Sequence, residues 1–205
     1  MPRSLFWSRT DTAGAEHTVL DDGAGPGFAA HGTQLAVDPI PYTCRYRLAT
    51  DADGITTSLA VEVEGAGWSR SVRLERDADG WRVRTGEQGD LDAALRAAGQ
   101  SPAGLPGIED TDRLHDALDV DLGGSALFNT LPIRRLGLAG AASGTAHRIT
   151  VAWVLVPSLE VVAGEQVYTA LGPGRVGFAS DTFRAELEVD DTGLVRHYPG
   201  LADLS

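Results

Sequence analysis

Two adjacent arginines, Arg134 and Arg135, lie in the stretch 128–138, which concentrates more chemically capable side chains than any other part of the sequence. A guanidinium binds phosphate or carboxylate oxygens through paired N–H groups, so either arginine could hold a lipid head group or its phosphate. The alternative is an internal ion pair with Asp119 or Asp121, which alternate with apolar residues upstream. Both alternatives satisfy a guanidinium that the fold places near its interior.

The polar residues before these arginines predict a turn followed by a strand. Pro132 fixes its own φ and disfavours the helical region for the residue before it. We therefore expect Asn129 and Thr130 to form a turn, and the chain from Ile133 onward to be extended. Neighbouring residues on a strand point to opposite faces, so one of the two arginines would point inward. Asn129 and Thr130 are candidate ligand contacts as well, although turn formation alone accounts for both.

Aromatic side chains are the second group that could bind a ligand. Tryptophan and tyrosine on strands can line an apolar cavity or stack on a sugar ring, and the alternative for each of them is packing in the core. Trp81, Trp153 and Tyr168 are taken as candidate ligand contacts. The whole set comprises Trp7, Tyr46, Trp68, Trp81, Trp153 and Tyr168.

The sequence gives little support for metal binding, cysteine chemistry or catalysis. The five histidines are not spaced as metal ligands, and no Gly-x-Ser-x-Gly motif is present, so we expect no metal and no cofactor. Cys44 is the only cysteine, which excludes an internal disulfide and a cysteine zinc site, and we expect an inert buried thiol. A hydrolase or isomerase is the catalytic alternative, with Asp121 and either His147 or His31 as an acid–base pair.

Length and composition limit the number of domains, the partners and the location of the chain. The 205 residues, 42% of them hydrophobic, suit a single domain over residues 1–205. The formal net charge of −12 argues against nucleic acid as a partner. The N-terminus lacks the apolar segment of a signal peptide, and no apolar run of about 18 residues could span a membrane. We therefore expect a cytoplasmic chain, and the sequence does not determine its oligomeric state.

The elements that must position these residues are mostly β-strands. Apolar and polar residues alternate in four segments between residues 42 and 85, joined by short acidic glycine turns, which predicts an antiparallel meander. Residues 86–118 have helical periodicity after a capping Asp90 and are interpreted as a small helical insertion. Residues 149–156 are apolar on both faces and are placed in the middle of the fold. In all we expect about ten antiparallel strands, whose edges require the sheet to curl or close. The further predicted strands are 6–7, 18–20, 159–162, 166–171, 176–179, 183–189 and 194–198, with a loop over 21–27.

Several motifs together resemble a bacterial family labelled "putative glycolipid-binding". They cover most of the chain apart from about residues 86–118, and they include the central Asn-Thr-Leu-Pro-Ile-Arg-Arg-Leu segment at 129–136. The resemblance implies a long antiparallel sheet rolled on itself, a spiral β-roll distantly like the half-barrels of bacterial lipoprotein carriers. It carries over no catalytic residues. The other matching motifs are Asp119-x-Asp121-Leu122, Asp79-Gly80-Trp81, Gln166-x-Tyr168 and the tail from Phe183 to Leu201.

The sequence thus leads to one hypothesis and two alternatives. The hypothesis is a β-roll that binds a lipid-like or glycolipid-like small molecule in its concave interior, without catalysis. The alternatives are the enzyme described above and an interaction protein with a solid core. An interior completely filled by its own side chains would contradict the hypothesis.

Overall fold

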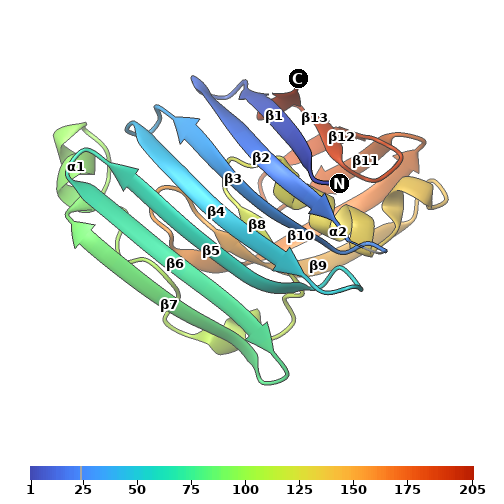
Figure 1. Cartoon of the computed structure of the whole chain (residues 1–205), viewed down its shortest axis with the longest axis horizontal. Helices are drawn as coiled ribbons and strands as arrows, with labels where there is room; N and C mark the ends of the chain where they lie inside the picture. Colours follow the sequence, from blue (N-terminus) through green and yellow to red (C-terminus); the bar gives the residue numbers. More distant parts are fainter. Residues whose placement is uncertain (24) are drawn as a thin grey trace.

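The computed structural model describes residues 1–23 and 25–205, and within them the chain forms one sheet of fourteen strands. The strand order is β7-β6-β5-β4-β3-β2-β1-β14-β13-β12-β11-β10-β9-β8, and the sheet curls so that its two halves face each other (Figure 1). Neighbouring strands are antiparallel except for β8, which is parallel to β9. The predicted long, rolled, mostly antiparallel sheet is confirmed. The strands are β1 (Arg3–Arg9), β2 (Gly14–Asp22), β3 (Phe28–Ala36), β4 (Tyr42–Thr50), β5 (Thr56–Gly65), β6 (Trp68–Asp77), β7 (Gly80–Gly89), β8 (Asp119–Leu122), β9 (Ala146–Val154), β10 (Val161–Gly172), β11 (Arg175–Ala179), β12 (Arg184–Val189), β13 (Val195–Tyr198) and β14 (Ala202–Leu204).

The meander β4–β7 forms as predicted because its side chains alternate between core and solvent. In β4, Cys44 and Tyr46 are buried on the inner face, whereas Arg45 and Arg47 are exposed on the outer face. The turn between β4 and β5 is closed by Asp51, whose carboxylate accepts hydrogen bonds from two backbone N–H groups of the turn. Burial raises the pKa of the Cys44 thiol, which keeps it protonated and unreactive.

The predicted strand count of ten was too low. β3 was missed because its Ala, Gly and His residues give a weak apolar alternation, although its inward residues are buried. β10 is one strand from Val161 to Gly172 where two were predicted. β2 continues through Asp22 into the predicted loop 21–27, and Ala24 of that loop lies outside the described residues.

The central stretch was predicted wrongly. Residues from Leu127 to Arg135 form helical turns, not a turn followed by a strand: the helices are η2 (Leu127–Asn129) and α2 (Thr130–Arg135). Pro132 fits this conformation because it lies in the first turn of α2, where a backbone N–H has no intrahelical acceptor to lose. The helix also buries Leu131 and Ile133, an energetic gain that outweighs the local preference of the residue before proline.

These helices fill the middle of the roll. Figure 1 shows α2 in yellow among the strands, and contacts of η2 to both halves of the sheet place these helical turns between them. The Phe128 ring lies edge-to-face on Tyr46 of β4, with 5.2 Å between ring centroids, and Asn129 bonds Tyr168 of β10. The centre of the roll is therefore packed with side chains of these helical turns.

The prediction that residues 149–156 lie in the middle of the fold, covered on both faces, was only partly correct, because both faces are buried around Val151 and Ala152 but not at Trp153. β9 ends at Val154 and is second from the sheet edge, beside the four-residue β8. Val151 and Val154 are buried, but Trp153 is 38% exposed. β9 is therefore covered by other parts of the chain over only part of its length.

The segment between β7 and β8 contains two short helices, α1 (Leu91–Ala97) and η1 (Thr111–Leu114). Asp90 caps α1 as predicted and accepts a hydrogen bond of 2.8 Å from the Ala93 N–H. β7 extends to Gly89, so the helical part begins later than residue 86. A third turn, η3 (Leu138–Gly140), follows α2. None of the helices in the described ranges is long and apolar enough to cross a membrane.

Candidate functional site

A cavity of about 580 Å³ opens on the inner face of the sheet, at the β8–β11 end and to one side of α2. Its volume lies within the usual range for small-molecule sites. The wall combines apolar and aromatic side chains with carboxylates, amides and hydroxyls. The lining residues are Asp121, Leu122, Gly123, Gly124, Ser125, Asn129, Trp153, Val162, Ala163, Gly164, Glu165, Gln166, Phe178, Ser180, Asp181, Thr182, Phe183, Tyr198 and Leu201.

The side chains of Asp121, Asn129 and Gln166 form a polar floor in this cavity, and hydrogen bonds connect them through Tyr168. The Gln166 amide donates to Asp121 Oδ2 at 2.7 Å, and its carbonyl oxygen lies 3.0 Å from the Tyr168 hydroxyl. That hydroxyl also lies 2.9 Å from Asn129 Oδ1, so its single proton is shared between two acceptors. Burial raises the pKa of Asp121 to about 6, although the bond from Gln166 opposes the shift. The network holds Asp121 as an oriented acceptor that lines the cavity.

Aromatic rings also line the cavity. Phe183 is 44% exposed, and its ring lies 6.3 Å from Phe178 and 6.1 Å from Tyr198 between centroids. Trp153, 38% exposed, contributes a further ring from β9. Partly exposed rings that border a polar floor can stack on a sugar or cover an alkyl chain.

The carboxyl group of Glu16 is buried next to Ser125, a residue of the cavity wall. Ser125 lines the cavity, and its hydroxyl is 2.7 and 2.9 Å from the two carboxyl oxygens of Glu16 in β2. The Tyr46 hydroxyl donates to the same carboxyl at 2.6 Å. Burial raises the pKa of Glu16 to about 7, against the effect of these bonds. Glu16 was missed by sequence reasoning because a single charged residue in a strand is usually exposed.

Helix α2 places Arg134 and Arg135 away from the cavity. Arg135 forms an ion pair with Asp119, with a shortest N–O distance of 2.6 Å, and Asp119 is fully buried. Burial raises the pKa of Asp119, and the guanidinium opposes that shift. Arg134 pairs with Asp22 at 2.7 Å. The internal ion pair proposed as an alternative is thus present for Arg135, and neither arginine is among the described lining residues of the cavity.

Two other candidates also lie outside the cavity. Thr130 is fully buried, and its hydroxyl accepts a hydrogen bond of 3.3 Å from the Val195 N–H. Trp81 packs in the core at the far end of the sheet and donates to the Ala117 carbonyl at 2.9 Å. Of the seven sequence-predicted ligand contacts, the structure brings together Asn129, Trp153 and Tyr168.

The proposed acid–base pair is not assembled. Asp121 bonds Gln166, and neither His147 nor His31 is among the lining residues that the described part of the chain contributes. His31 borders a different hollow, on the outer face beside Arg47.

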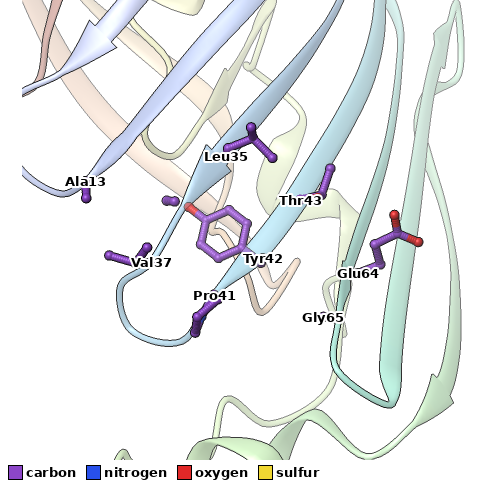
Figure 2. Close-up of a pocket in the computed structure, with 9 residues that line it drawn as sticks. Ala13, Leu35, Val37, Pro41, Tyr42, Thr43, Glu64 and Gly65 are labelled. Carbon is purple, nitrogen blue, oxygen red and sulfur yellow. The ribbon is translucent and has the colours of Figure 1, made fainter.

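A shallower hollow lies at the ends of β3–β5 and is lined by Leu35, Val37, Pro41 and Tyr42 (Figure 2). Leu35 and Val37 are 52% and 46% exposed. The hollow is wide open, and within the described part of the chain no side-chain hydrogen bond joins two of its lining residues. The cavity beside Asp121 is therefore the stronger candidate site.

Comparison with known proteins agrees with the fold. The model of a family described as "Putative glycolipid-binding" matches residues 4–203. A crystal structure of a DUF1089 family protein from Pseudomonas aeruginosa is similar, with a TM-score of 0.68 and 28% identity over 92% of this chain and 91% of that chain. No curated protein matches the chain.

Proposed function

Because this chain belongs to the "Putative glycolipid-binding" family, we propose that it binds a glycolipid-like amphiphile, without catalysis, in the cavity beside Asp121. The observation that carries the proposal is the pairing of an oriented polar floor with partly exposed rings in one cavity. A sugar head group has hydroxyls for the floor and apolar C–H faces for the rings.

The site we propose is narrower than the one predicted from sequence. The head group contacts Asp121, Asn129 and Gln166, and Tyr168 acts through them by holding the two amides in place. Trp153 and Phe183 lie where the ligand passes from the cavity to the surface. Since the centre of the roll is packed, the alkyl chain lies along these rings and does not enter the roll axis.

Truncating an aromatic ring tests this proposal. We expect Phe183→Ala to weaken binding of octyl β-glucoside about tenfold, because a bound alkyl chain loses the apolar surface of that ring. Isothermal titration calorimetry below the micelle concentration measures the change. The matched control is Phe6→Ala, since Phe6 is 45% exposed against 44% for Phe183 but lies in β1, away from the cavity.

Equal binding by the two variants, or no binding by the unaltered protein, would refute the proposed site. The glucoside recovered after incubation is expected to be intact. Release of glucose would support the hydrolase alternative instead.

A further inference from the structure

The charges around the cavity restrict the head group further. Two aspartates line it, Asp121 in the floor and Asp181 in the loop before β12. Glu165 on β10 also borders it, but its carboxylate accepts a hydrogen bond from Thr150 on the opposite face of the sheet from Gln166. No arginine or histidine belongs to the lining that the described residues form. An anionic head group would therefore meet only negative charge in a partly enclosed space, which is unfavourable.

The arginines near the cavity are paired with carboxylates of their own. Arg135 is paired with Asp119, and Arg9, which approaches the lining residue Gly124, is paired with Asp11. Arg148 lies 3.9 Å from Glu165, an exposed pair that has little effect on the floor of the cavity. Asp121 has an amide as its side-chain partner, so its charge is not cancelled by a cation.

The aromatic side of the cavity fits a cation as well. The negative face of an aromatic ring attracts an ammonium group, and Trp153 and Phe183 are both partly exposed at the cavity. Asp121 and Trp153 are paired across β8 and β9, so a carboxylate and an aromatic ring lie side by side at the cavity, an environment suited to a positively charged nitrogen.

We propose that this cavity selects an amphiphile whose head group carries a positively charged amine, and that Asp121 is its ion-pair partner. This inference rests on the proposed function and deepens it. It requires the amine to bind more tightly than a neutral sugar on the same tail, and an anion to bind least.

Three probes with the same tail test the order: octylammonium, octyl β-glucoside and octyl phosphate, each titrated below its micelle concentration at about pH 8, where carboxylates are ionised. We expect octylammonium to bind about tenfold more tightly than the glucoside. Asp121→Asn keeps an oxygen acceptor and removes the charge, and it should abolish most of that preference, measured as the ratio of the octylammonium and glucoside affinities. Asp53→Asn, an exposed turn residue, is the control for the overall negative charge of the protein and should change nothing.

The outcomes separate the two proposals. Equal affinity for the amine and the glucoside, or an unchanged preference in Asp121→Asn, would overturn the amine assignment and leave amphiphile binding intact. Tightest binding of octyl phosphate would also overturn it. If none of the three probes binds, both proposals are wrong.

Discussion

Replacing Asp119 with alanine is expected to lower the free energy of unfolding by about 3 kcal/mol, because it leaves the Arg135 guanidinium without its anion. Asp119 is fully buried, and the Arg135 side chain is only 13% exposed. Three N–O distances of 2.6 to 3.2 Å join the two groups, so a single substitution removes a bidentate pair. Chemical denaturation of the purified variant measures the loss.

The control is an ion pair of the same kind on the surface. Arg45 and Glu64 are joined at 2.7 Å, but their side chains are 54% and 53% exposed, so Glu64→Ala should cost less than about 1 kcal/mol. Combining Asp119→Ala with Arg135→Met should recover part of the lost stability, since no unpaired charge remains. Equal losses for Asp119→Ala and Glu64→Ala would show that the buried pair does not stabilise the fold.

Raising the pH from about 5 to about 7 is expected to lower the free energy of unfolding, with Glu16 contributing about 2 kcal/mol to the decrease. The pKa of Glu16 is about 7 in the folded protein against 4.5 for an ordinary glutamate. In this interval the folded state holds a proton on Glu16 that the unfolded state has released, so stability falls as the pH rises. Below about pH 4.5 both states are protonated, and this contribution no longer varies.

Glu16→Gln isolates the effect, because glutamine resembles the protonated carboxyl and can still bond Ser125 and Tyr46. Urea unfolding at a series of pH values should show a flatter dependence for this variant than for the unaltered protein. Asp121, with a pKa of about 6, contributes a dependence of the same sign in both proteins, so the comparison uses the difference between them. Identical pH dependences would mean that Glu16 does not titrate above its ordinary range.

The architecture was largely predictable from the sequence because strand alternation is a local signal. The meander β4–β7 has inward aromatic and aliphatic residues at every second position, and its turns carry Asp and Gly. α2 was not predicted because Pro132 in the middle of the segment was given more weight than the apolar spacing of Leu127 and Leu131, which are four residues apart and both buried. Tertiary packing overrode the local preference.

The candidate site was only partly predictable from the sequence, because residues that are far apart in the chain meet only in the folded sheet. Asn129, Trp153 and Tyr168 were identified by residue type; Asn129 and Trp153 line one cavity, and the buried Tyr168 bonds Asn129 from behind its wall. Glu16 and Ser125 are 109 residues apart in the chain and meet only in the rolled sheet. Conversely, the most conspicuous sequence feature, the adjacent Arg134 and Arg135, forms ion pairs away from the cavity, since helical turns direct the two side chains to Asp22 and Asp119.

The most direct test of amphiphile binding is native mass spectrometry of the protein isolated from its own host, followed by solvent extraction. Gly164 lines the cavity, and a Cβ there would have only ordinary contacts, so Gly164→Phe should fill the cavity while the protein still folds. Gly140→Phe, in η3 with open space around its Cβ, is the matched control. We predict close to one amphiphile per chain in the unaltered protein and in Gly140→Phe, and none in Gly164→Phe. A bare chain mass in all three proteins, or equal occupancy in Gly164→Phe, would contradict the account.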